Sequence, residues 1–346
     1  MAGKQVVTIH DVAKRAGVAV SSVSRALSNH PDVSDKMRAR VLKAANALGY
    51  APDPSAQSLR SGSTRTVGLV VRDFGNALFS EIMYGAEAVL TDAGYTLLVM
   101  NSGGDADREL ERIGLLRQRR VDALLLSSIS DTSAATQKAI AGFRKPVVLL
   151  DRDPGSYAVS TVNFDHAQGV REATADLLSL GHRRIAMVTG SPEIRPTRER
   201  LRGFREAQSQ IDLKLQPDLE LTGVFSAQFA REKTIELFSR PLRLRPTALV
   251  TGGVQSTIGV LEGLSELGVQ PATDISLVVC DDLPWLRIMH PVISVVARDA
   301  EGMGRAAAAE VLNLISGSDP TSQLLPTQYE RRETSNPLRR RSSVRN

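Results

Sequence analysis

Short apolar runs alternate with amphipathic stretches along most of this chain. The runs TVGLVV, YTLLVM, VDALLLSS and KPVVLLD predict buried strands, and residues 79–93, 107–119 and 132–141 predict the helices between them. After Asp165 the pattern starts again: the strands RRIAMVTG, TALVTG and ISLVVCDD alternate with predicted helices over residues 167–180, 198–210, 227–238 and 254–268. This is the βαβ rhythm of parallel sheets, and its restart predicts two α/β subdomains. We expect VISVV and a helix over residues 300–315 to return to the first sheet.

The first 50 residues follow a different pattern, with apolar side chains at helical spacing. Ile9, Val12, Ala13 and Ala16 recur at i, i+3, i+4 and i+7, which predicts one buried helix face. Thr8 precedes this helix as an N-cap and Gly17 follows it as a helix end. A third amphipathic helix is marked by apolar residues and capped by Ser34; these apolar residues are Val33, Met37, Val41, Ala44, Ala45 and Leu48.

The helix after Gly17 hides an apolar side and presents a polar one. Val23, Ala26 and Leu27 repeat the i, i+3, i+4 spacing, so Ser21 and Arg25 point away from the buried side. Small hydroxyls beside one guanidinium are what a helix needs in order to enter the major groove of DNA. The alternative is that the polar side is simply the solvated face of a helical hairpin.

Charge is distributed unevenly along the chain. Residues 1–65 hold ten Lys and Arg against four Asp and Glu, a net charge of +6, whereas residues 66–330 carry −6. A basic head on an acidic body indicates that the head alone contacts phosphates. Residues 331–346 carry +5 and lack apolar periodicity, so they are predicted to be disordered. A second, nonspecific phosphate contact is the alternative for this tail.

Several classes of protein are excluded by what the sequence lacks. No run approaches the roughly 20 apolar residues of a membrane span, and the N-terminus has no signal-peptide core, so we expect a cytoplasmic protein. The single cysteine, Cys280, excludes a disulfide framework or a Cys-rich zinc site. The five histidines are scattered without ligand spacing, and phosphate-loop, dinucleotide and nucleophile-elbow motifs are missing. We therefore expect neither an enzyme nor a bound metal or cofactor.

Residues 6–71, from VVTIHDVAKRAGV through VSRALS and ALGYAP to TVGLVV, resemble the N-terminal part of the lactose-repressor (LacI/GalR-type) family of bacterial transcriptional regulators. The resemblance continues in LSLGHRRIAMVTG, RLRGF and DISLVVCDD, and so covers roughly residues 6–330. It implies an α/β protein with a helix-turn-helix headpiece (1–50), a hinge helix (51–65), a periplasmic-binding-protein-like core of two parallel-sheet subdomains (66–330), and a tail (331–346). The expected subdomains are 66–163 with 292–330, and 164–291. Members of the family bind two kinds of partner: double-stranded DNA and a small-molecule effector. The resemblance also implies that the DNA is a palindromic operator and that it is bound by a homodimer.

The DNA contacts follow from the headpiece and from the resemblance. We expect Val20, Ser21, Ser22 and Arg25 to meet base edges, and Thr8, Ser24 and Asn29 to meet phosphates. The segment PSAQSLRS (54–61) is too short to be a stable helix alone. By resemblance it forms a hinge helix on DNA, in which Leu59, with the small Ala56 before it, wedges into the minor groove. A plain linker is the alternative.

Effector contacts are expected where predicted strands end. Asp73 and Phe79 follow the first strand, Arg200 follows VTGSPE, and Asp281 ends ISLVVC; Phe225 could cover the apolar side of a ligand. Arg200 and Asp281 match effector-binding positions of the family. The alternative is that Arg200 pairs with Glu199 or Glu193, and that Asp281 caps a turn.

The sequence also departs from the family pattern. Gly252-Gly253 replaces the usual Asn-Asp pair, Ala77-Leu78 replaces Pro-aromatic, Asp53 replaces Asn, and Ala19 replaces a capping Ser. A sugar or sugar derivative remains the leading effector class, and a nucleoside or another polyol-like ligand is possible. The ending SNPLRRRSSVRN has no leucine heptads, so we expect a dimer and not a tetramer.

Overall fold

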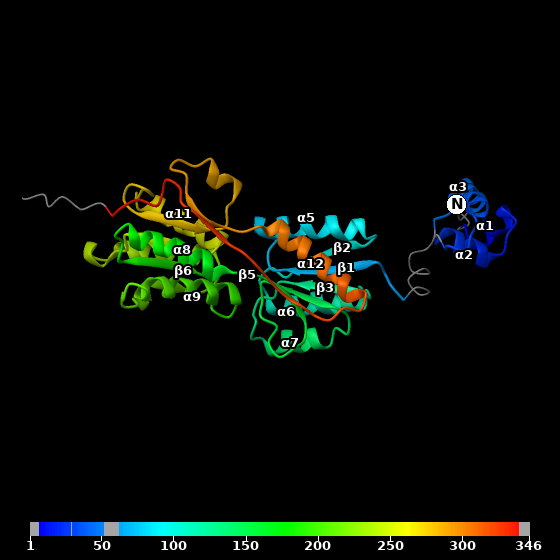
Figure 1. Cartoon of the computed structure of the whole chain (residues 1–346), viewed down its shortest axis with the longest axis horizontal. Helices are drawn as coiled ribbons and strands as arrows, with labels where there is room; N and C mark the ends of the chain where they lie inside the picture. The colour runs from blue at the N-terminus through cyan, green and yellow to red at the C-terminus, as the bar shows by residue number, and fades with distance from the viewer. Residues whose placement is uncertain (1–6, 29, 52–61, 339–346) are drawn as a thin grey trace, which may run out of the picture. The chain divides into compact units, whose positions relative to one another are not determined.

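The computed structural model describes residues 7–28, 30–51 and 62–338, which fall into two compact units divided between Thr64 and Arg65 (Figure 1). The first unit, the headpiece, contains α1 (Ile9–Ala16), α2 (Val20–Leu27) and α3 (Asp35–Leu48). Their apolar faces meet in one small core, whose buried members are Val12, Ala13, Ala16, Val23, Ala26, Val33, Val41, Ala44 and Ala45. The three predicted helices and their buried faces are therefore confirmed.

Helix α1 is capped at both ends, whereas α2 begins without a side-chain cap, as the sequence predicts. Thr8 caps α1, and its backbone N–H and hydroxyl both donate to Oδ2 of Asp11, at 2.8 and 2.7 Å. Gly17 ends α1 with a φ of 61°, a left-handed conformation that costs glycine little. At the N-cap of α2, however, Ala19 has no side-chain acceptor for the free N–H groups of the first turn.

Replacing Ala19 by serine is therefore expected to stabilise the headpiece. Ala19 is exposed and its backbone is already extended, so the hydroxyl can reach the first-turn N–H groups without a clash. The gain should be about 1 kcal/mol, which raises the melting temperature of a unit this small by about 4–8 °C. Hydrogen exchange of the α2 amides measures the gain directly. Unchanged α2 protection would contradict it.

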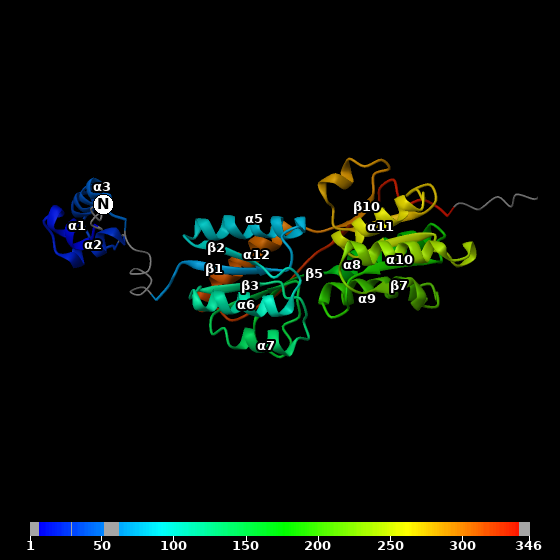
Figure 2. The ribbon, with the colours of Figure 1, turned by 180° about the vertical axis from the view of Figure 1, so that it is seen from behind.

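The second unit, the core, begins with a six-stranded sheet in the order β11-β5-β4-β3-β1-β2, with all its pairs parallel. Its strands are β1 (Thr66–Val71), β2 (Thr96–Asn101), β3 (Ala123–Leu126), β4 (Val147–Leu150), β5 (Ser160–Phe164) and β11 (Ser322–Leu325). Helices α5 (Ala77–Asp92) and α12 (Ala300–Ile315) cover one face, and α6 (Ala106–Gln118) and α7 (Ala134–Ala141) cover the other (Figures 1 and 2).

A second six-stranded sheet has the order β12-β10-β9-β8-β6-β7, and only β12 is antiparallel to its neighbour. Its strands are β6 (Ile185–Thr189), β7 (Glu220–Thr222), β8 (Ala248–Thr251), β9 (Ser276–Cys280), β10 (Ser294–Ala297) and β12 (Gln328–Glu330). Helices α8 (His166–Ser179) and α9 (Arg195–Ser209) pack on one face, and α10 (Ala227–Ser239) and α11 (Val254–Glu266) pack on the other. The short 3-10 helices η1 (Pro217–Leu219), η2 (Leu242–Leu244) and η3 (Pro284–Arg287) lie in the connections.

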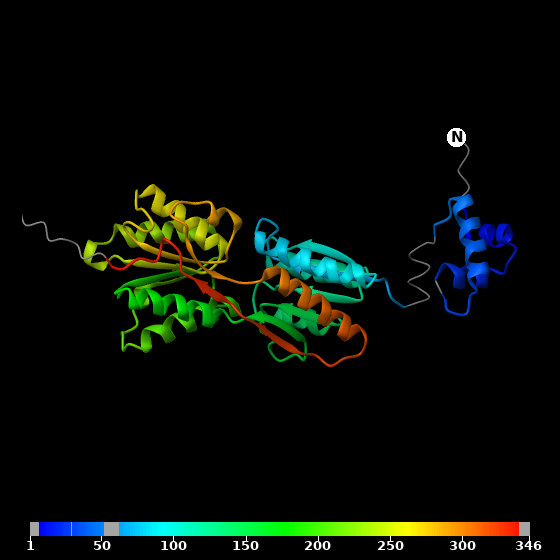
Figure 3. The ribbon, with the colours of Figure 1, turned by 45° about the horizontal axis from the view of Figure 1, so that its top comes forward.

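The expectation that VISVV returns to the first sheet is wrong. This stretch forms β10, which pairs with β9 and β12 in the second sheet, and the chain crosses to the first sheet only at α12. It then crosses back between β11 and β12, as the orange-red segment in Figure 3 shows. An apolar run indicates a buried strand but does not indicate which neighbour it pairs with, so its sequence could not decide the sheet.

The prediction of a disordered tail from residue 331 is wrong for residues 331–338. Thr334 and Ser335 are buried beside the second sheet. The N–H of Leu277 donates to the carbonyl of Thr334 at 2.9 Å, and the Thr334 hydroxyl donates back to the Leu277 carbonyl at 2.6 Å. Small hydroxyl side chains can thus order a polar segment against backbone groups. Residues 339–346 lie outside the described residues.

Candidate DNA interface and effector cleft

Helix α2 presents the polar side that its sequence predicts. Ser21 and Arg25 are exposed, one helical turn apart, while Val23 and Ala26 are buried beneath them. Three further candidates are partly buried: Val20, Ser22 and Ser24. Val20 packs partly against the headpiece core, which leaves only part of its side chain for a contact with a base.

Other predicted DNA contacts have a structural role or lie outside the described residues. Both donors of Thr8 are engaged by Asp11, so its first role is to cap α1. The remaining candidates, Asn29, Ala56 and Leu59, lie outside the described residues, as does most of the expected hinge.

A cleft lies between the two subdomains of the core, where strands of both sheets end. It is lined by Arg72, Asn76, Leu78, Phe79, Ile82, Ser127, Leu150, Asp151, Arg152, Ile194, Pro196, Thr197, Arg200, Phe225, Gly253, Asp281, Arg298 and Met303. The predicted residues Phe79, Arg200, Phe225 and Asp281 thus come together from four separate segments. Asp73 was also predicted to contact the effector, but it does not line the cleft. Its Oδ1 accepts the N–H of Gly75 at 2.8 Å, so the side chain folds back onto its own turn.

Arg200 and Asp281 are buried in the cleft, with 4% and 6% of their surface exposed. Arg200 donates to the carbonyl of Gly252 at 2.9 Å, and Asp281 accepts from Nε of Arg298 at 2.6 Å. The alternative pairing of Arg200 with a neighbouring glutamate is not seen, since Glu199 instead binds Arg202. Asp281 also has a φ of 81°, a strained conformation for a non-glycine residue and one that clusters at functional sites.

A buried ion network that the sequence analysis missed connects the two subdomains. Arg298, from the chain crossing after β10, donates to Asp151 after β4 at 3.2 Å, and lies over the Phe164 ring at 5.1 Å. Asp151 is also 2.7 Å from Nε2 of His166. Burial alone would raise the pKa of the Asp151 carboxyl, but His166 and Arg298 together hold it well below its usual value. The sequence did contain a signal for these two residues, because Asp151 and Arg298 each directly follow an apolar run that predicts a strand.

His166 makes this network sensitive to pH. Burial holds the pKa of the imidazole below its usual value, although Asp151 acts in the opposite direction. A histidine that is neutral when folded takes up a proton on unfolding below about pH 6.5. The free energy of unfolding of the core should therefore fall by on the order of 1–2 kcal/mol between about pH 7 and pH 5 because of this residue. Urea titrations of the native chain and of His166→Asn at both pH values measure this change in the free energy of unfolding. The same change in both proteins would contradict the prediction.

Hydrogen bonds and ion pairs outside the cleft lining also join the two subdomains. The N–H of Arg195 and the guanidinium of Arg198 both donate to Oδ2 of Asp131, at 2.5 and 2.8 Å. Arg198 also binds Asp153 at 2.5 Å. The free volume inside is about 60 Å³, which is room for a few water molecules and not for a sugar ring. A ligand of that size therefore requires the subdomains, or the side chains that fill the cleft, to move.

The packing around Gly252-Gly253 leaves little room for side chains at these two positions. A Cβ on Gly252 would lie 2.0 Å from Oγ1 of Thr189, and Gly253 has a φ of 119°. A Cβ on Gly253 would also lie 3.1 Å from the Phe225 ring. Side chains at both positions would therefore displace Phe225 and Thr189, so side-chain contacts with a ligand must come from other residues.

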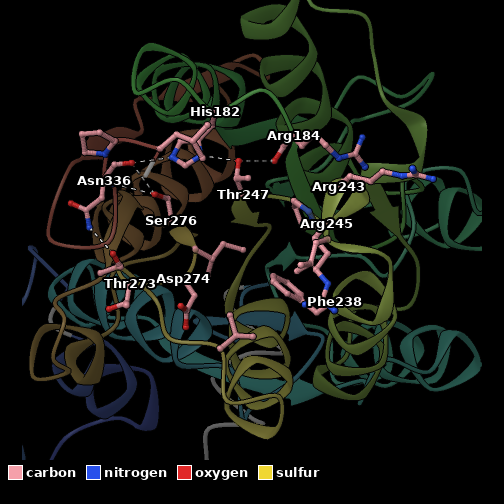
Figure 4. Close-up of a pocket in the computed structure, with 17 residues that line it drawn as sticks. His182, Arg184, Phe238, Arg243, Arg245, Thr247, Thr273, Asp274, Ser276 and Asn336 are labelled. Atoms are coloured by element: carbon pink, nitrogen blue, oxygen red, sulfur yellow. Dashed lines mark hydrogen bonds between the residues drawn. The ribbon is translucent and has the colours of Figure 1, made fainter. Parts of the chain in front are cut away.

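A second pocket of about 990 Å³ lies at the opposite ends of β6, β8 and β9 (Figure 4). His182 is held there between the Thr247 hydroxyl at 2.9 Å and the carbonyl of Asn336 at 3.0 Å. Arg184 donates to Gln216 at 2.8 Å and to the carbonyl of Leu244 at 2.7 Å. These polar groups fasten residues 336–338 and η2 to the sheet, so we assign them a structural role.

Two family models match the chain. Bacterial regulatory proteins of the lacI family match residues 8–53, and the periplasmic binding proteins and sugar binding domain of the LacI family match residues 64–335. The chain belongs to the LacI family. It is accordingly a DNA-binding transcriptional repressor, and the resemblance noted in its sequence is confirmed, together with the predicted fold class.

Relatives of known name cover nearly all of this LacI-family chain. The ribose operon repressor of Escherichia coli K12 is 31% identical over 317 residues, 91% of this chain and 94% of that protein. The repressor PurR of Aliivibrio fischeri MJ11 is 28% identical over 323 residues, 93% and 96% of the two chains. Among solved structures, the lac repressor dimer bound to operator and the anti-inducer ONPF has a TM-score of 0.83 at 25% identity, covering 96% of this chain and 100% of that one. Within the described residues, no helix is long and apolar enough to cross a membrane.

Proposed function

We propose that this LacI-family repressor binds a palindromic operator as a homodimer, with α2 of each subunit in the major groove. The exposed Ser21 and Arg25 on a compact helix-turn-helix unit carry the proposal. Arg25 forms a fork to guanine, Ser21 and Ser22 contact neighbouring base edges, and Val20 offers its exposed part to a thymine methyl. Ser24 and Asn29 contact phosphates. Two headpieces on a two-fold axis multiply the specificity of one.

The effector binds in the cleft between the subdomains, at Arg200, Asp281, Phe79 and Phe225. Arg200 and Asp281 supply charge-assisted hydrogen bonds, and the two aromatic rings cover an apolar side of the ligand. A sugar derivative remains the leading class, which is consistent with the E. coli relative named for the ribose operon. The protein has no enzymatic role in this proposal, and it acts on DNA in the cytoplasm.

Ligand binding changes DNA affinity because it changes the angle between the subdomains. Phe79 comes from the first subdomain, whereas Arg200, Phe225 and Asp281 come from the second, so a ligand that contacts both favours one cleft geometry. The closed geometry is held by Asp131 with Arg195 and Arg198. A ligand too large for the present cavity therefore competes with these contacts or rearranges them.

Operator titration in the presence of a metabolite library tests both parts of this proposal. The full chain is first titrated against a labelled palindromic duplex and a scrambled one at fixed salt, since affinity without a stated salt concentration cannot be interpreted. Compounds that raise the melting temperature of the chain are then added to the operator titration. We expect at least one to change operator affinity. A chain that binds both duplexes equally would contradict the repressor model.

A further inference from the structure

The cleft has more positive than negative charge in its walls. Its lining includes four arginines and two carboxylates. Both carboxylates are already engaged, because Arg298 binds Asp281 at 2.6 Å and Asp151 at 3.2 Å. Arg152 has Asp131 at 3.7 Å, just outside the lining. The two other lining arginines, Arg72 and Arg200, take part in none of these ion pairs.

Neither Arg72 nor Arg200 has a carboxylate within ion-pair distance among the described residues. Arg200 donates to the carbonyl of Gly252 and its charge acts on Asp281, but its buried Nε has no hydrogen-bond partner among the described residues. Arg72 is partly buried, and its burial and the nearby charge of Arg152 lower the pKa of its guanidinium, although the charge of Asp73 acts in the opposite direction. Burying a cation without an ion-pair partner is unfavourable, and an anion in the cleft would offset that cost.

The position of Arg72 suits an exchangeable ligand contact. It directly follows β1 in the first subdomain, and its guanidinium lies 5.3 Å from the centroid of the Phe225 ring in the second. Its only hydrogen bond to Phe225 is a long one, 3.5 Å to the carbonyl. Such a contact is weak and can be replaced by the oxygens of a ligand at little cost.

We propose that the effector carries an anionic group, a phosphate ester or a carboxylate, and that Arg72 binds it. This rests on the proposed function of the cleft. A guanidinium fork matches both groups in geometry and charge, and Arg200 and Arg152 add to the positive field. Asp281 accepts hydrogen bonds from the uncharged part of the ligand. The specificity is thus for an acidic or phosphorylated polyol over its neutral counterpart.

Matched ligand pairs test the proposal by calorimetry on the full chain. The pairs are D-ribose with D-ribose 5-phosphate, D-glucose with D-glucose 6-phosphate, and D-glucose with D-gluconate; inorganic phosphate is a separate probe. We expect one charged member to bind at least tenfold more tightly than its neutral partner. Arg72→Gln should lower that affinity at least tenfold, and Arg72→Lys should lose less. Arg117→Gln, at an exposed arginine of the same subdomain, is the matched control and should change nothing.

The arms separate the possible outcomes. Tight binding of the phosphate esters and of free phosphate assigns a phosphate group, and tight binding of gluconate assigns a carboxylate. Equal affinity for both members of every pair, unchanged affinity in Arg72→Gln, or no binding of any charged compound overturns the proposal. If only a neutral sugar binds, and its binding is lost in Arg200→Ala, then the cleft is the effector site but the proposal of an anionic effector is wrong. Binding that survives both Arg200→Ala and Arg72→Gln would reject the cleft itself.

Discussion

Replacing Arg25 by alanine is expected to lower specific operator affinity by on the order of 10²- to 10⁴-fold, because a bidentate guanidinium–base contact is worth about 1–3 kcal/mol and the dimer makes two. Arg25 is exposed on α2, and its backbone lies one turn beyond Ser21 on the same polar side. Its loss should leave nonspecific binding nearly unchanged. Titration of the operator and of a scrambled duplex at the same salt concentration gives both affinities.

Arg15→Ala is the matched control, since Arg15 is an exposed arginine in the last turn of α1. A phosphate contact there would weaken binding to both duplexes by a similar factor and reduce the salt dependence. If Arg25→Ala behaves in the same way, with an unchanged ratio of specific to nonspecific affinity, then Arg25 does not discriminate between bases and the assignment to the major groove fails.

Replacing Arg200 by alanine is expected to abolish the response to the effector while operator binding is kept. The guanidinium is buried in the cleft and anchored by the Gly252 carbonyl, so alanine removes both the ligand contact and its orientation. Losing one charge-assisted hydrogen bond costs about 1.5–3 kcal/mol, a 10- to 100-fold loss of ligand affinity. Thermal shift with each hit of the metabolite screen, followed by operator titration, measures both properties in one preparation.

Asp281 needs a milder substitution than alanine. Its removal would leave Arg298 buried beside Asp151 alone, and breaking a buried ion pair costs about 3–5 kcal/mol. Asp281→Asn keeps the shape and one acceptor oxygen, so a lost response in that variant reports on the ligand and not on folding. Arg202→Ala, on the exposed side of α9, is the control and should respond like the native chain. A compound that still raises the melting temperature of both Arg200→Ala and Asp281→Asn binds outside the cleft.

Local patterns were sufficient for the headpiece. The apolar spacing of Val12, Ala13 and Ala16 and the left-handed Gly17 are short-range features, and the structure confirms the helices and the turn that they predict. Likewise Arg200 and Asp281 reach the cleft because residues at strand ends and at the start of the following helix meet at one edge of a parallel sheet. Asp73 shows the limit of that rule, since a loop aspartate can satisfy its charge on the next backbone N–H instead.

The sequence by itself indicated a DNA-binding head on a paired α/β core, with most of its helices and its longer apolar strands, because periodicity and motif spacing are properties of the chain alone. It did not predict the strands β5, β7, β11 and β12. Only the tertiary structure decided that β10 joins the second sheet and that Thr334 and Ser335 are buried against it. The same holds for the meeting of Arg298 with Asp151, 147 residues apart, and for Arg72 facing Phe225 across the cleft. These contacts depend on which strands become neighbours and how far the subdomains close, and that is set by the packing of the whole core, not by any one segment.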